Sequence, residues 1–245
     1  MHERPELNDP VLIEGLPGIG FVANIAALHL INELKAKLFA EITSSSFQDL
    51  SVTLENGTTL SPINRLYYYK ANESGRDLII WHGNTQGLTT FGQYELCGVV
   101  LDIAVDLGCG YVITLGGFRR ELTKKEPQTY CAASDSEALE KALSLGTKIM
   151  VGQIYGLAGV TVGLAKLRNL KSFALLVETP GTVPDAEAAL KALRNLNSFL
   201  GMKIDLSRVN NAAEETKSML ESFGLMSRRV KEEKRVEETD FRWFV

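Results

Sequence analysis

The hydrophobic positions divide the chain into alternating strand-like and helix-like stretches. Residues 11–13 form a short apolar run typical of a strand buried on both faces, and residues 14–20 then break it with three glycines and a proline. From residue 21 to 31, large apolar side chains recur at helical spacing with alanines between them. A buried strand, a glycine-rich turn and a helix predict the first unit of an α/β fold.

The same alternation continues to about residue 223. Further strands are predicted at residues 37–43, 65–70, 77–81, 111–115, 129–133 and 172–178, and Asn-Gly at 56–57 predicts a hairpin. Helices are predicted at residues 89–107, 134–145, 156–170, 185–200 and 206–223. In the helix at 89–107, Tyr94, Val99 or Val100, Ile103 and Leu107 mark the expected buried face. The pattern predicts a mixed, largely parallel central sheet flanked by helices.

The C-terminal residues depart from this pattern. Residues 227–240 are dense in charge of both signs and have almost no apolar side chains, so they cannot bury a core. The chain then ends on the aromatic segment 241–245, FRWFV. We therefore expect a single α/β domain at residues 1–226 and a charged C-terminal tail at residues 227–245. The aromatic end can insert into a partner's pocket or fold back onto the protein's own surface.

Composition narrows the class of protein. The net charge of −4 over 245 residues argues against a nucleic-acid binder, and no apolar run reaches the length of a membrane span. The N-terminus lacks the apolar segment of a signal peptide. The three cysteines are an odd number without metal-ligand spacing, which suits a reducing compartment. We expect a cytoplasmic protein that holds no metal.

Two glycine-rich loops are candidate ligand sites. Residues 18–23 match the dinucleotide fingerprint G-x-G-x-x-A, but Leu16 and Pro17 separate this motif from the strand, so the glycines can equally serve only to build the turn. Residues 116–120, GGFRR, follow a strand and can bind an anion or form a turn with solvated arginines.

Isolated polar residues carry weaker signals. Glu14 and Glu178 lie at the carboxyl ends of predicted parallel strands, where α/β sites form, but no triad or metal pattern assigns them a role; the same holds for Asp102 and Asp106. His82 could pair with Cys97 or Cys131 as a nucleophile, although structural roles are the commoner use of such residues.

Several short motifs together resemble the proteasome assembly chaperone 2 family, in its archaeal single-domain form. The matching segments occur in the expected order, at residues 14–20, 83–88, 115–118, 154–159 and 178–186. The resemblance implies an α/β fold similar to nucleoside-phosphorylase-type folds, without an established catalytic centre or cofactor. It also implies chaperones or activators of the proteasome core particle that act as homo- or hetero-oligomers.

The resemblance extends to the last three residues. Some members of the family carry a C-terminal hydrophobic-tyrosine-any motif that inserts between proteasome α subunits. Trp243, Phe244 and Val245 align with this motif, with Phe244 in place of the tyrosine, so the phenolic hydroxyl is absent. Docking by shape and by the terminal carboxylate is compatible with that change.

Two hypotheses follow from the sequence. The first is a non-enzymatic homo-oligomer that docks on the proteasome α ring through Trp243, Phe244 and Val245. The second is a small-molecule or nucleotide-binding enzyme, an ATP-grasp-like ligase or a nucleoside-processing enzyme, which uses loops at residues 15–20, 82–86 and 116–120. These loops all follow strands, so they are expected to converge. The residues of this possible ligand site are Gly15, Gly18, Gly20, Gly116, Gly117 and Arg119.

Overall fold

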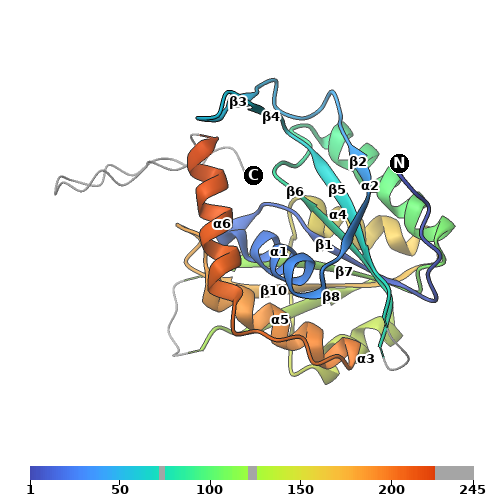
Figure 1. The fold of residues 1–245 in the computed structure, drawn as a ribbon. Helices are drawn as coiled ribbons and strands as arrows, with labels where there is room; N and C mark the ends of the chain where they lie inside the picture. The colour runs from blue at the N-terminus through green and yellow to red at the C-terminus, as the bar shows by residue number, and fades with distance from the viewer. Residues whose placement is uncertain (72–74, 121–125, 224–245) are drawn as a thin grey trace.

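A computed structural model describes residues 1–71, 75–120 and 126–223 of the chain. Its centre is an eight-stranded sheet in the order β2-β5-β6-β1-β7-β10-β8-β9 (Figure 1). In that order the strands are β2 (Lys37–Ile42), β5 (Asn64–Tyr69), β6 (Leu78–Gly83), β1 (Val11–Gly15), β7 (Tyr111–Arg119), β10 (Lys171–Thr179), β8 (Thr129–Ala133) and β9 (Lys148–Ile149).

The middle of the sheet is parallel and its flanks are mixed. Strands β6, β1, β7 and β10 pair in parallel, whereas β2, β5 and β8 join them through antiparallel pairs. A separate hairpin joins β3 (Val52–Thr53) to β4 (Thr59–Leu60). The mixed, largely parallel sheet predicted from the sequence is confirmed.

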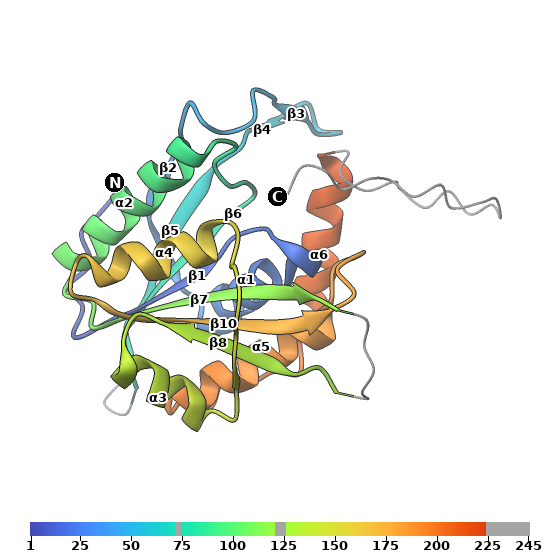
Figure 2. The same ribbon diagram turned by 180° about the vertical axis from the view of Figure 1, so that it is seen from behind.

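Helices cover both faces of this sheet. Successive side chains of the buried strands point to opposite faces, so each face has its own hydrophobic core. On β1, Val11 and Ile13 belong to the core under α1 (Val22–Leu34), α3 (Ser136–Ser144), α5 (Ala186–Leu200) and α6 (Val209–Ser222). Leu12 belongs to the opposite core, under α2 (Thr90–Asp106) and α4 (Leu157–Lys166). Figure 2 shows α2 and α4 side by side on their face. The short continuous hydrophobic runs in the sequence indicated strands buried on both faces, and the central strands have this burial.

Three expectations need correction. The helix begins at Val22 rather than at residue 21, because a short 3-10 turn (Ile19–Phe21) precedes it and Phe21 has a left-handed backbone with φ of 51°. Strand β7 continues through Gly116 and Gly117 to Arg119, since those glycines pair with Leu176 and Val177 of β10. The predicted turn at residues 116–120 is therefore wrong for all but its last residue.

The third correction concerns the buried face of α2. Val100 and Leu107 are buried and Ile103 packs against the core, as predicted, whereas Tyr94 and the alternative Val99 are exposed. The helix carries apolar residues around most of its circumference, so helical spacing alone did not exclude Tyr94 or decide between Val99 and Val100. The sequence also gave no sign of β9, a two-residue edge strand that is exposed.

Candidate functional site

A cavity of about 400 Å³ opens at the carboxyl ends of β1 and β7. Its walls come from the loop after β1, the loop after β6, the end of β7 and the segment that leads into α4. The chain leaves β1 toward α1 on one face and leaves β6 toward α2 on the other. A crevice where neighbouring strands connect to opposite faces is the usual ligand position in open α/β sheets.

The loops expected to converge do meet at this cavity, but not all of the predicted glycines line it. Gly18, Gly116, Gly117 and Arg119 form part of its wall. At Gly117, an added Cβ would lie 2.1 Å from the carbonyl oxygen of Ile19, so the glycine lets the loop after β1 cross β7 closely. These four residues are thus placed together by the fold.

Gly15 and Gly20 serve the packing around the cavity instead. A Cβ at Gly15 would lie 2.1 Å from the Cβ of Ala27, so this position sets how closely α1 approaches β1. Gly20 has φ of +63°, a conformation that glycine adopts without steric cost. Neither of these two glycines lines the cavity.

Side-chain amides hold the cavity walls in position. The Gln86 amide nitrogen donates to the carbonyl oxygen of Pro17, and its oxygen accepts from the Leu157 N–H at 3.5 Å, joining the loops after β6 and β1 to the start of α4. Behind the cavity, the Asn24 amide donates to the carbonyl oxygens of Gly15 and Gly83, at 3.4 and 2.8 Å. The ends of β1 and β6 are therefore fixed to the first turn of α1.

Glu14 is the one acidic side chain among the described residues that line the cavity. It is only 2% exposed, and its Oε1 accepts from the Leu16 N–H at 3.0 Å. Its Oε2 has no hydrogen-bond partner within the described part of the chain. Burial raises the pKa of this carboxyl to about 8, so it is mostly protonated at neutral pH and its hydroxyl can donate a hydrogen bond.

Glu178 has a different role from Glu14. Its Oε1 accepts from Arg120 and from the Tyr130 hydroxyl, at 3.1 and 3.0 Å, while its Oε2 accepts from the Gln128 N–H at 3.0 Å. These bonds tie the end of β10 to β7 and β8, and Glu178 does not line the cavity. Asp102 is likewise engaged, in an ion pair with Arg168. Neither carboxylate is placed for acid-base chemistry at the cavity.

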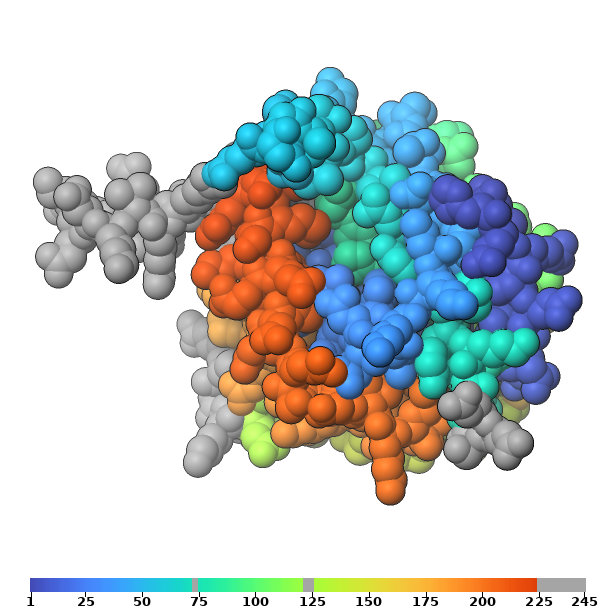
Figure 3. All heavy atoms as spheres, viewed as in Figure 1, coloured from blue at the N-terminus to red at the C-terminus, as the bar shows by residue number. Residues whose placement is uncertain are grey.

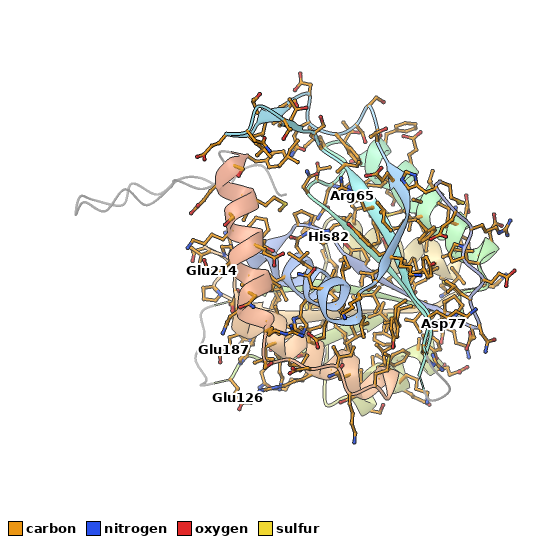
Figure 4. The ribbon with its side chains drawn as sticks, viewed as in Figure 1. Arg65, Asp77, His82, Glu126, Glu187 and Glu214 are labelled. Carbon is orange, nitrogen blue, oxygen red and sulfur yellow. The ribbon has the colours of Figure 1, made fainter. Side chains whose placement is uncertain are left out.

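The structure does not bring His82 and the cysteines together. His82 lies opposite Arg65 on the neighbouring strand, and burial together with that guanidinium lowers its pKa to about 4 (Figure 4). Its neighbour Trp81 points into the α2–α4 core with Cys97, so His82 points to the other face. Burial raises the pKa of the Cys97 thiol to about 12. This pairing therefore offers no activated thiolate.

Metal and membrane chemistry receive no support from the part of the chain that the structure describes. No three or more His, Cys, Asp or Glu side chains gather there in a way that could hold a metal ion. Nor does any described helix combine the length and apolarity needed to cross a membrane.

Comparison with known proteins places the chain in a family. The model of the PAC2 family matches residues 12–223, which is most of the chain. The chain belongs to the PAC2 family. Among curated relatives of this PAC2 protein, an uncharacterized protein of Methanocaldococcus jannaschii is 30% identical over 217 residues, covering 88% of this chain and 83% of the relative.

Two solved structures from Pyrococcus furiosus are similar over nearly the whole chain. PbaB, described as an archaeal proteasome activator, has a TM-score of 0.80 and 36% identity, covering 91% of this chain and 96% of PbaB. PbaA, described as an archaeal homolog of proteasome-assembly chaperone, has a TM-score of 0.72 and 29% identity, covering 88% of this chain and 92% of PbaA.

The C-terminal end of the described PAC2 fold lies at the same edge of the sheet as the cavity. Helix α6 packs against α1 (orange beside blue in Figure 3), and Arg208 before its start pairs with Glu33 near the end of α1. Further along α6, the Thr216 hydroxyl donates to Asn24 in the first turn of α1 at 3.4 Å. The proposed docking residues Trp243, Phe244 and Val245 lie outside the described residues.

A second surface of this PAC2 protein carries exposed apolar side chains. Phe91 and Tyr94 are 77% and 51% exposed, and Val99 and Val105 of the same helix are 44% and 45% exposed. We call these four residues the α2 outer face. Exposed apolar side chains gathered on one helix are typical of an interaction surface.

Sequence reasoning missed the fourth wall of the cavity, residues 150–158. Gln153, Ile154 and Tyr155 line the cavity ahead of α4. The signal was present, since residues 154–159 are one of the motifs that carried the family resemblance. The helix predicted at residues 156–170 includes only the end of this segment.

Proposed function

We propose that the protein is a proteasome assembly chaperone or activator without enzymatic activity, which docks on the α ring of the proteasome core particle through its C-terminal tail. The observation that carries this proposal is membership of the PAC2 family together with 36% identity to PbaB over 91% of the chain. PbaB is described as a proteasome activator. The similarity covers the folded body, so the tail mechanism rests on separate arguments.

The tail mechanism is supported by the chemistry of the chain end and by where the described fold stops. Trp243, Phe244 and Val245 align with the hydrophobic-tyrosine-any motif of some family members and supply two aromatic rings, which an apolar pocket can bury. The chain leaves α6 at the carboxyl edge of the sheet, and residues 224–240 follow before the aromatic segment. A polar tether of that length can carry the motif to a groove beyond the folded body.

We propose further that the protein acts as a homo-oligomer and that the α2 outer face is the contact between copies. Burying Phe91 and Tyr94 removes large aromatic surface from water, and aromatic side chains are enriched in the cores of protein interfaces. An oligomer also presents several tails to a ring of α subunits. Simultaneous docking then strengthens binding without any new kind of contact.

A binding titration against archaeal proteasome core particles tests the docking mechanism. The full chain is compared with a chain that ends at Arg242, and Phe241→Ala serves as a control that removes an aromatic ring from the tail but keeps the last three residues. We expect the full chain and the control to bind, and the truncated chain to lose binding. Equal binding by all three would remove the tail from the mechanism.

The cavity supports a second candidate function, the binding of a small molecule. The observation that favours this function is that the buried Oε2 of Glu14 has no hydrogen-bond partner in the described chain. A thermal-shift screen with nucleotides and nucleosides tests the enzyme-like form of this hypothesis. A shift with any of them would favour it, and no shift with all of them would count against it.

A further inference from the structure

The floor of the cavity holds a neutral hydrogen-bond donor without an acceptor. Glu14 pairs in register with Trp81 of β6 and Thr114 of β7, so its side chain points to the face of the sheet that α2 and α4 cover. Its Oε1 accepts from the Leu16 N–H, whereas its buried Oε2 has no partner in the described chain. Because burial raises the pKa of this carboxyl to about 8, Oε2 carries a proton at neutral pH.

The first turn of α4 lies over the same face. The Thr114 hydroxyl, beside Glu14 in the sheet, donates to the carbonyl oxygen of Ala158 at 3.1 Å and so holds the start of the helix close to β7. The backbone N–H groups in the first turn of this ten-residue helix add a partial positive charge to the cavity. That charge favours an acceptor oxygen near Glu14 and disfavours a cation.

The rest of the wall on this face is apolar. Leu176 of β10 pairs with Gly116, and an added Cβ at Gly116 would lie 2.8 Å from its Cδ2, so the leucine side chain covers the glycine. Phe118, Met150 and Ile154 pack against the same cluster and line the cavity. The cavity therefore combines a polar floor with an apolar side.

No full positive charge faces this space from the described residues of the wall. Arg119 is the one basic side chain among them. It follows Phe118 on β7, so it points to the other face of the sheet, and an added Cβ at Gly181 would lie 3.3 Å from its Nε. A ligand that carries a full charge would lose its hydration beside Glu14 without gaining an opposite charge.

The wall also offers an acceptor on the α2 side. Gln93, in the first turn of α2, lines the cavity and donates its amide N–H to the carbonyl oxygen of Gly87 at 3.2 Å. Its amide oxygen accepts no hydrogen bond from the described residues. A donor at Glu14 and an acceptor at Gln93 complement the carbonyl oxygen and the N–H of an amide.

We propose that the cavity binds an uncharged molecule of the amide class, whose carbonyl oxygen accepts a hydrogen bond from Glu14 and whose hydrocarbon part packs against Ile154 and Leu176. The proposal names the ligand class of the second candidate function, small-molecule binding, and rests on it. A volume of about 400 Å³ is in the range of small-molecule pockets and holds an amide with roughly four to eight carbons.

Calorimetric titration of the full chain with compounds of matched shape tests the ligand class. The probes are hexanamide, hexanoate and hexylamine, together with benzamide, benzoate and benzylamine. Each set keeps one hydrocarbon part and changes the polar end from neutral to anionic or cationic. We expect at least one amide to bind, and to bind at least about tenfold more tightly than its charged counterparts.

Variants of Glu14 test the hydrogen bond. Glu14→Met removes the donor at similar size, and Glu14→Gln restores a donor that cannot ionise. The matched controls are Glu140→Met and Glu140→Gln, at an exposed glutamate of α3 on the opposite face of the sheet. We expect Glu14→Met to weaken amide binding about tenfold or more, Glu14→Gln to bind within about threefold of the unmodified chain, and both controls to leave binding unchanged. Urea unfolding checks that each variant is folded.

Three results would overturn the proposal. Tighter binding of a carboxylate or an amine than of the matching amide would replace the ligand class but leave small-molecule binding in place. Equal amide binding by Glu14→Met and the unmodified chain would remove Glu14 from the site. Binding of none of the six compounds would reject the amide class, while the nucleotide and nucleoside screen tests the broader function separately. The proteasome titration is independent of all of these.

Discussion

At the scale of single residues, Glu14 links the fold to its cavity. A carboxyl group that is 2% exposed would ordinarily be replaced by an apolar side chain or paired with a cation. Here one oxygen is held by the Leu16 N–H and the other faces a cavity. Groups of this kind reduce stability and are retained where a ligand uses them.

Glu14 gives the free energy of unfolding a specific dependence on pH. Its pKa rises from 4.5 to about 8 on folding, so between these values the folded protein binds more protons than the unfolded chain, and stability falls as pH rises. Above pH 8 both states are ionised and the loss is complete.

Replacing Glu14 by Gln should therefore stabilise the protein most at high pH. We expect Glu14→Gln to gain on the order of 2–5 kcal/mol relative to the unmodified chain at pH 9, and much less at pH 5. Urea unfolding at the two pH values measures this difference. An equal effect of the substitution at pH 5 and pH 9 would show that the carboxyl does not change its protonation on folding as described.

Substitution of Gly15 tests how closely α1 packs on β1. A Cβ there would lie 2.1 Å from the Cβ of Ala27 and 2.8 Å from the carbonyl oxygen of Ala23, so α1 must move. We expect Gly15→Ala to lower the free energy of unfolding by about 1–3 kcal/mol or more. Gly163→Ala, in α4 with nothing within 4 Å, is the control and should stabilise slightly through helix propensity. Equal effects in urea unfolding would contradict the close packing.

At the scale of elements, the order of strands and helices followed from hydrophobic spacing, whereas their ends and faces did not. Strand β8 matched its predicted bounds, and Asp135 caps α3 by accepting a hydrogen bond from the Ala138 N–H at 2.9 Å. Gly116 and Gly117 looked like a turn because glycine breaks most strands. They lie within β7 because β10 pairs with them and the loop after β1 crosses there, which is long-range information.

The cavity was predictable only in part for the same reason. Three strand ends were expected to converge, and the parallel centre of the sheet brings them together. The fourth wall, before α4, comes from the segment that follows β9. Its motif at residues 154–159 contributed to the family resemblance but did not indicate that the segment lies beside the ends of β1 and β7. The burial of Glu14 was equally hidden, since a single acidic residue after an apolar run is compatible with an exposed strand end.

The α2 outer face is a feature of one helix, and we predict that it holds copies of the protein together in an oligomer. We expect Phe91→Gln to lower the molar mass measured by light scattering during gel filtration, because the substitution removes the largest exposed ring of the face. Val183→Gln, at an exposed valine outside α2, is the matched control and should leave the mass unchanged. An unchanged mass in Phe91→Gln, with a preparation that is oligomeric, would place the contact elsewhere.

At the scale of the whole molecule, the cavity and the exit of the chain from α6 share one edge of the sheet. The bonds from Thr216 to Asn24, and from Asn24 to Gly83, connect α6 to the end of β6. The loop after that same strand forms part of the cavity. A ligand in the cavity and a partner at the tail would therefore act on neighbouring parts of the protein.

The folded body does not by itself account for binding to the proteasome α ring. The proposed docking therefore depends on the last three residues of the sequence. The measurement that tests it most directly is the equilibrium titration of proteasome core particles with the full chain and with the chain that ends at Arg242. The account predicts binding by the full chain and at least a hundredfold loss on removal of Trp243, Phe244 and Val245. Equal affinity of the two chains would contradict it.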